Sequence, residues 1–164
     1  MKLEAYKLRA TTIPVNSIIH SMANGLWDLS PAYQRGSVWP LANRVNLIES
    51  LVRDFPISAV YLNYRSETAE VAYCVDGKQR IETIWLFVTD QFAVPRDWFY
   101  DEDLHENARS KETVFWSDLT HKTQLDMRLH RALAAFYTSL PTEDAERELY
   151  NRVNYGGVPH EDPT

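Results

Sequence analysis

The clearest hydrophobic pattern in the sequence lies between residues 41 and 55. Apolar side chains there recur at steps of three and four, which places them on one face of a helix. They are Leu41, Val45, Ile48, Leu51, Val52 and Phe55. Pro40 stands at the start, where its missing N–H does no harm, and Pro56 ends the helix. The pattern predicts an amphipathic helix that packs one face against a core.

A strand, a turn and a helix are predicted in succession around Asp76. Residues 57–63 and 70–75 are rich in β-branched and aromatic side chains, which is typical of strands. Asp76 and Gly77 form a common turn pair. Residues 79–88 then return to helical spacing. The turn at Asp76 therefore joins a buried strand to a helix.

The flanking regions carry weaker patterns. The elements predicted in them are a strand or extended arm over 3–11, a short helix between Pro14 and Gly25, a short strand over 26–29, a helix near 120–131, a strand near 132–138 and a helix near 142–153. Residues 91–118 are aromatic and acidic and are predicted to be an insertion with only short elements. Because strands and helices interleave, the class is α/β or α+β.

Composition narrows the choice of protein class. The 164 residues suit one domain, over 1–164, and 45% hydrophobic with 24% charged residues is ordinary for a soluble globular protein. The net charge of −6 argues against a generally basic nucleic-acid coat. The acidic side chains cluster outside segment 35–80, where positive and negative charges are nearly balanced. The charge distribution therefore allows a local positive site in this segment.

Cysteine usage and hydropathy exclude several further classes. The single Cys74 excludes an internal disulfide and a cysteine zinc cluster, and its apolar neighbours predict a buried small side chain. The histidines show no metal-ligand spacing. No signal peptide is visible and no apolar run approaches the ~18 residues of a membrane span. A cytoplasmic protein without membrane contact is expected.

The segment Asp76-Gly77-Lys78-Gln79-Arg80, here called the Asp76 turn, is the strongest candidate site. A loop that opens a helix presents backbone N–H groups and the positive end of the helix dipole, which suits an anion. Lys78 and Arg80 add charge and Gln79 adds an amide. Asp76 can hold Mg²⁺ or accept a proton, with Glu82 as a possible second carboxylate. The alternative is that Asp76 merely caps the helix while both cations are solvated.

Two other segments are weaker candidates on their own. Tyr33-Gln34-Arg35 precedes Trp39, so Arg35 can contact a phosphate while Tyr33 or Trp39 stacks a base; alternatively, the aromatics pin a surface loop to the core. The second segment ends a helix with Gly156-Gly157, an ordinary C-terminal cap, although Asn154 and Arg152 can also face a ligand.

Taken together, these segments resemble the family found at the N-terminus of GmrSD-type restriction systems. The matching features, over roughly residues 12–160, are Pro31-x-Tyr33-Gln34-Arg35 with Trp39, a helix ending Phe55-Pro56-Ile57, a strand with Tyr61-Leu62, the Asp76 turn in place of the family's Asp-Gly-Gln-Gln-Arg, and Arg152-Val153-Asn154-Tyr155-Gly156-Gly157. The resemblance implies an α+β fold of the ParB/sulfiredoxin-like type, a small mixed sheet flanked by helices. Relatives of that fold bind nucleoside triphosphates for hydrolysis, for switching or for phosphorylation.

The resemblance also assigns roles to residues. Carried over by motif, Asp76, Gln79 and Arg80 are active-site residues, and Gly77 and Lys78 bind phosphate with Arg80. The residues implied beside them are Gln34, Arg35, Asn154, Gly156 and Gly157. Lys78 stands where the family usually has Gln, and the sequence stops at Thr164 without the HNH nuclease part of the full-length systems. Nuclease activity by this chain alone is therefore not expected.

The expected function is Mg²⁺-assisted phosphoryl transfer from a nucleoside triphosphate in phage or bacterial DNA modification or restriction. With a hydroxyl on a modified base or nucleoside as acceptor the protein is a kinase, and with water it is an NTPase. The alternative is a non-catalytic nucleotide sensor or a decoy that engages a restriction system. A DNA nickase is a weaker alternative. Expected partners are a nucleotide, DNA and a protein of a restriction system.

Overall fold

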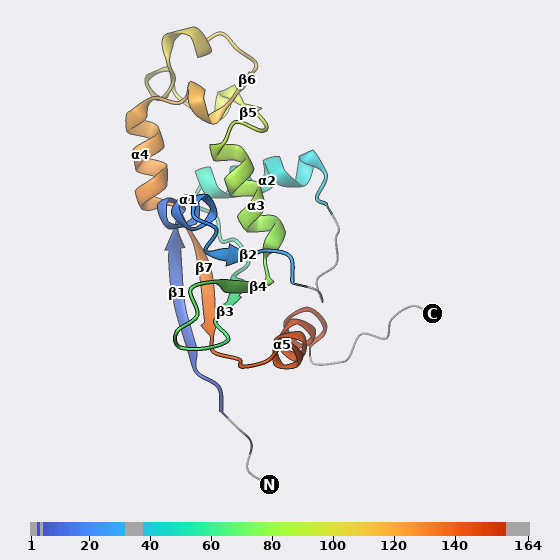
Figure 1. The fold of residues 1–164 in the computed structure, drawn as a ribbon. Helices are drawn as coiled ribbons and strands as arrows, with labels where there is room; N and C mark the ends of the chain where they lie inside the picture. Colours follow the sequence, from blue (N-terminus) through green and yellow to red (C-terminus); the bar gives the residue numbers. More distant parts are fainter. Residues whose placement is uncertain (1–2, 4, 32–37, 157–164) are drawn as a thin grey trace.

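A five-stranded mixed sheet organises the chain, of which this computed structural model describes residues 3, 5–31 and 38–156 (Figure 1). Its strands are β1 (Leu8–Pro14), β2 (Trp27–Asp28), β3 (Val60–Asn63), β4 (Ala72–Asp76) and β7 (Ala132–Thr138). Their order in the sheet is β1-β7-β3-β4-β2. The β1–β7 and β3–β4 pairs are antiparallel, whereas β3–β7 and β2–β4 are parallel.

Helices flank this sheet, and the expected α+β class with a small mixed sheet is confirmed. The helices are α1 (Val15–Ala23), α2 (Leu41–Val52), α3 (Lys78–Val88), α4 (His121–His130) and α5 (Glu143–Tyr155). Fully buried apolar side chains from the helices and the sheet, including Ile18, Ile48, Leu62, Ile81 and Leu133, form the core between them. In Figure 1, α5 lies apart from the other helices, at the end of the sheet away from α4.

The helix predicted over residues 41–55 is shorter than its apolar pattern. It ends at Val52, and Asp54 adopts a left-handed conformation with φ of 58° that turns the chain away. Phe55 is therefore 53% exposed, with the Arg53 guanidinium over its ring, and does not belong to the buried face. At the other end of the pattern, Leu41 is 59% exposed and does not belong to it either. Cys74 is fully buried, as its neighbours predict. No helix within residues 3, 5–31 and 38–156 is both long and apolar enough to cross a membrane.

Residues 91–118 form short elements at the C-terminal end of α3 (Figure 1). They are the two-stranded sheet of β5 (Val94–Pro95) and β6 (Thr113–Val114) and the 3₁₀ turns η1 (Arg96–Trp98), η2 (Asp101–Asp103), η3 (Glu106–Ala108) and η4 (Trp116–Asp118). Leu104 and Val114 are fully buried and belong to the same apolar cluster as the main sheet. This segment packs at the end of α3 opposite the Asp76 turn.

Asp118 ties the 91–118 segment together. Its carboxylate accepts hydrogen bonds from Lys111 Nζ at 2.8 Å and from the Phe115 N–H at 2.9 Å. Burial by itself would raise the pKa of the Asp118 carboxyl, but these hydrogen bonds outweigh it and hold the pKa below its usual 3.8. The charged carboxylate therefore contributes stability above that value, and this contribution is lost as the pH falls through the lowered pKa.

Asp118→Asn is expected to lower the free energy of unfolding at neutral pH by about 1–3 kcal/mol, because two hydrogen bonds to a charged acceptor are weakened. Urea unfolding of both proteins across a pH series measures the difference. This difference should be complete at neutral pH and begin to shrink below about pH 4, where the carboxyl of the unfolded chain becomes protonated. It should disappear once the pH lies below the lowered pKa of the folded protein. A difference that stays constant down to strongly acidic pH would contradict the charge-based explanation.

Gly77 is the tightest point between the sheet and α3. Its φ of +103° lies in the left-handed region, and a Cβ at this position would stand 2.5 Å from Val60 Cγ1 and 3.1 Å from Val60 Cα. Because Val60 is fully buried in β3, neither side can move aside easily. Packing and backbone conformation thus require a glycine at position 77, whether or not the turn binds a ligand.

Gly77→Ala is expected to reduce the free energy of unfolding by about 2–4 kcal/mol, through backbone strain and overlap with Val60. Gly25→Ala is the matched control, since Gly25 has a φ of +64° but no atom within 4 Å of the position that a Cβ would take. It should cost only about 1 kcal/mol. Denaturant unfolding of the two variants compares them, and equal losses would refute the close approach to Val60.

Candidate functional site

The Asp76 turn has a different internal structure from an ordinary capped helix. Asp76 is the last residue of β4, and Gly77 is the N-cap of α3, with no side-chain capping hydrogen bond. Instead, Asp76 Oδ2 accepts a hydrogen bond from Arg80 Nη2 at 2.9 Å. Of the two interpretations of this turn, helix capping by the Asp76 side chain is therefore wrong.

Arg80 is an anchored side chain. Its Nη2 also donates to the backbone oxygen of Ala59 at 2.9 Å, and its side chain is only 17% exposed. Its Nε is buried and has no hydrogen-bond partner among the described residues. The guanidinium is therefore held next to Asp76 at the positive end of the α3 dipole, with donor capacity left over.

Asn154 completes this cluster from the far end of the chain. Its Nδ2 donates to the Tyr150 backbone oxygen at 2.9 Å and lies 3.5 Å from Asp76 Oδ1. A separation of 3.5 Å is at the limit of a hydrogen bond, so Oδ1 is the more weakly held of the two carboxylate oxygens. The structure thus brings together Asp76, Arg80 and Asn154, as the motif-based interpretation expects.

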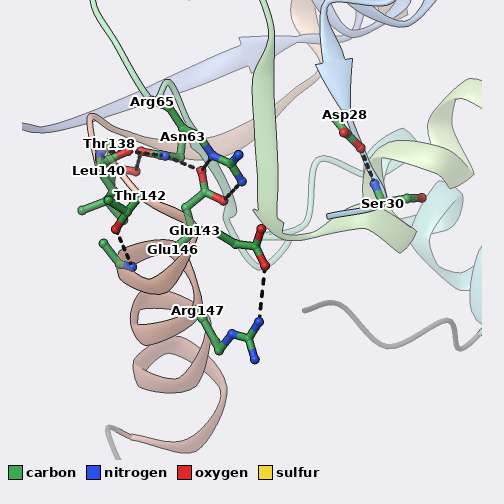
Figure 2. A network of polar contacts seen from close by, with 11 residues as sticks. Asp28, Ser30, Asn63, Arg65, Thr138, Leu140, Thr142, Glu143, Glu146 and Arg147 are labelled. Carbon is green, nitrogen blue, oxygen red and sulfur yellow. Dashed lines mark hydrogen bonds and ion pairs between the residues drawn. The ribbon is translucent and has the colours of Figure 1, made fainter. Parts of the chain in front are cut away.

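A polar network attaches α5, the helix that carries Asn154, to the sheet (Figure 2). Glu146 in the first half of α5 is fully buried, and its carboxylate accepts hydrogen bonds from Arg65 Nε and Nη2, both at 2.9 Å. These bonds raise the pKa of the Arg65 guanidinium above its usual value, so it stays charged. The guanidinium also lies 3.8 Å from the centre of the Tyr73 ring in the neighbouring strand.

Asn63, at the end of β3, links this ion pair to the sheet. Its Nδ2 donates to Glu146 Oε1 at 2.7 Å and to the Leu140 backbone oxygen at 2.9 Å. Its Oδ1 accepts from Thr138 Oγ1 at 2.8 Å and from the Leu140 N–H at 2.7 Å. All four hydrogen-bonding positions of the Asn63 amide are therefore used, which specifies one position for α5.

Glu146→Gln is expected to lower the free energy of unfolding by about 2–4 kcal/mol, because it leaves the Arg65 charge without its bidentate partner. Glu148→Gln, two residues further along α5, is the control. The Glu148–Arg152 pair is more than 60% exposed on both sides, so this change should stay within about 0.5 kcal/mol. Urea unfolding compares them, and a similar small loss in both variants would show that the buried network does not attach α5.

Gln79 faces α2, and its side chain makes hydrogen bonds within the protein. Its Oε1 accepts from the Trp39 N–H at 3.2 Å and from Arg44 Nη2 at 3.4 Å. Arg44 is 6% exposed and donates from Nη1 to Thr83 Oγ1 at 2.9 Å. The amide oxygen of Gln79 therefore holds the chain at Trp39 against α3, and a catalytic role of Gln79 stays a prediction.

Glu82 also points toward Arg44, with its Oε2 3.9 Å from Arg44 Nη2. Asp76 has Arg80 and Asn154 as its partners, so the two candidate metal ligands share no contact. The described residues contain no group of three or more His, Cys, Asp or Glu side chains arranged to hold a metal ion. A single carboxylate such as Asp76 is sufficient for Mg²⁺, because this ion commonly takes one protein carboxylate together with substrate phosphates.

Lys78 leans toward the chain that follows β2. Its Nζ donates to Ser30 Oγ at 3.1 Å, and the Ser30 N–H donates to Asp28 Oδ1 at 2.8 Å (Figure 2). Tyr33, Gln34 and Arg35 lie outside the described residues. The described residues on either side of them, Ser30 and Trp39, are hydrogen-bonded to Lys78 and Gln79 of the Asp76 turn.

Of the remaining predicted site residues, those that the structure describes lie against the core or at the end of α5. Trp39 is partly buried against the core, which agrees with the interpretation that it pins a loop, and base stacking on it stays a prediction. Gly156 has a φ of 62° and caps α5, as expected for a C-terminal glycine, while Gly157 lies outside the described residues. Arg152 is exposed and ion-paired with Glu148.

Two supporting features of the site are not among the residues predicted from the sequence. Arg44 falls three residues after Leu41 and four before Ile48, and a charged residue on an apolar face is a usable signal for a buried polar cluster. The Asn63–Arg65–Glu146 network gives no such signal, because Glu146 sits in an acidic stretch that resembles a solvated helix face.

Comparison with known proteins gives one result. The family model for the N-terminal domain of the GmrSD restriction endonuclease matches residues 15–163. No curated protein and no solved structure matches the sequence. The matched range contains all three candidate segments, including the Asp76 turn and Asn154.

Proposed function

Because the chain belongs to the family of GmrSD restriction endonuclease N-terminal domains, we propose that it serves a restriction or DNA-modification system by transferring the terminal phosphoryl group of a nucleoside triphosphate at the Asp76 turn. The observation that carries this proposal is the placement of Asp76 between Arg80 and Asn154 at the N-terminus of α3. It combines one carboxylate, one anchored cation and a helix dipole at a single point.

The charges of the turn match the needs of phosphoryl transfer. The reaction spreads negative charge over the phosphate oxygens, so catalysis is largely positioning and charge stabilisation. Arg80 and Lys78 supply two cations, and the first turn of α3 supplies the positive end of its dipole. Lys78 donates to the neutral Ser30 hydroxyl, which leaves its positive charge available to a phosphate.

The chemical step is an in-line displacement at the terminal phosphorus. An acceptor oxygen forms the new P–O bond, the bond to the bridging oxygen breaks, and the nucleoside diphosphate leaves with that electron pair. The acceptor's proton passes to a base, for which Asp76 Oδ1 is the better placed oxygen, because Oδ2 is held by Arg80. In the alternative role, Asp76 would hold Mg²⁺ instead of accepting the proton, and the ion would supply further charge stabilisation.

The acceptor distinguishes two enzymes of the same chemistry. A hydroxyl of a modified DNA base or nucleoside makes the protein a kinase, and water makes it an NTPase. A non-catalytic nucleotide sensor is the second candidate function. The Asp76–Arg80 ion pair favours the sensor, because it engages one oxygen of the only carboxylate in the turn.

Binding is tested by thermal unfolding with each common ribo- and deoxynucleoside triphosphate plus Mg²⁺. At least one is expected to raise the melting temperature, and Arg80→Ala should weaken its binding by about tenfold or more, because a charge-assisted contact to phosphate is lost. Arg147→Ala is the control, since Arg147 is exposed on α5 and pairs with Glu143. Circular dichroism checks that Arg80→Ala is folded, and Lys78→Ala provides a second variant with a smaller structural role.

The reaction is tested with γ-labelled triphosphate and DNA that carries hydroxymethylated bases. Label in the DNA identifies a kinase, and labelled free phosphate identifies an NTPase. Nucleotide binding without either product favours the sensor. The absence of a thermal shift with every triphosphate would overturn the nucleotide-binding proposal as a whole.

A further inference from the structure

A pocket lies at the opposite end of β3 from the Asp76 turn. Tyr61 in β3 pairs with Asp76, whereas Asn63 pairs with Tyr73, so the chain beyond Asn63 runs away from the turn. The pocket there has a volume of about 590 Å³, within the range of small-ligand sites. Its walls come from β1, from the end of β7 and from the connection between β3 and β4.

Stacked aromatic rings form one part of this pocket. The rings of Tyr64 and Tyr137 are nearly parallel, with centroids 5.9 Å apart and an angle of 14° between them. The Arg9 guanidinium lies 4.9 Å from the centre of the Tyr137 ring. Burial raises the pKa of the Tyr137 phenol, so it stays neutral. Because Arg9 is exposed, a planar ligand can replace it on Tyr137 or extend the stack at Tyr64.

Charged side chains line opposite sides of the same pocket. Lys7 and Arg9 come from the β1 side, and Glu67 and Glu70 come from the β3–β4 connection. Lys7 Nζ and Glu67 Oε1 are 3.1 Å apart, but both side chains are more than 80% exposed. Such an exposed ion pair contributes little stability, so a ligand can separate the two groups at small cost.

We propose that this pocket binds a nucleotide unit with an amino-bearing base, which is cytosine, adenine or guanine. The base would stack on the tyrosine pair, its phosphate would bind Lys7 and Arg9, and its exocyclic amino group would donate to Glu67 or Glu70. The unit is either a free nucleotide or part of a single strand. Since the pocket shares none of its lining residues with the Asp76 turn, binding here does not depend on the proposed function of that turn.

Fluorescence anisotropy of a labelled single-stranded oligodeoxycytidine hexamer, at low ionic strength, tests the pocket. Binding is expected, with displacement by excess dCMP. Arg9→Ala should weaken it by about tenfold, through loss of one phosphate contact. Arg53→Ala is the matched control, because Arg53 is likewise an exposed cation, 4.5 Å from the centre of the Phe55 ring. Arg80→Ala should also bind normally, which separates this pocket from the Asp76 turn.

The affinities of several ligands show whether the pocket takes a nucleic-acid strand or a free nucleotide, and which base it prefers. If the hexamer binds much more tightly than dCMP, the natural ligand is a nucleic-acid strand. If dCMP binds as tightly as one nucleotide site of the hexamer, the ligand is a free nucleotide. Oligothymidine should bind more weakly than oligodeoxycytidine, because thymine has no exocyclic amino group. The proposal is overturned if neither hexamer nor dCMP binds, or if Arg9→Ala and Lys7→Ala, both at exposed positions, bind like the wild type.

Discussion

The buried contact between Glu146 and the Arg65–Asn63 pair is the constraint on which the arrangement of the candidate site depends. A fully buried carboxylate is costly unless it is paired and hydrogen-bonded, and here both of its oxygens are occupied. Only one position of α5 satisfies this requirement. That position carries Asn154, two turns further along, to Asp76 Oδ1. A structural ion pair at the end of the sheet thus determines the geometry of a polar cluster elsewhere.

Three sets of contacts hold the Asp76 turn in place. Gly77 packs against Val60 in β3, Gln79 binds the chain at Trp39 and the buried Arg44, and Lys78 binds Ser30. These contacts leave Arg80 as an anchored cation next to Asp76. Rigid support of this kind is what a preorganised anion site requires. Membership of the GmrSD N-terminal domain family implies a role for the chain in a restriction system.

The two proposed ligand sites differ in what supports them. The Asp76 turn joins charge with a helix N-terminus and suits phosphates, whereas the Tyr64–Tyr137 pocket joins aromatic rings with opposed charges and suits a base. They lie at opposite ends of β3, which makes them separate sites on one sheet.

The sequence by itself predicted most elements of the fold and the segments of the candidate site, although the strand expected over 3–11 runs from Leu8 to Pro14. Periodicity and turn residues depend on neighbouring positions, so the helix that became α2 and the strand–turn–helix at Asp76 could be predicted from them. The tertiary structure decided the rest. Asp76 binds Arg80 instead of capping α3, and Glu82 turns to Arg44 instead of Asp76. Asn63 and Glu146 meet across 83 positions of the chain. Local patterns cannot specify such pairs, because packing of distant elements chooses the partner of each buried polar group.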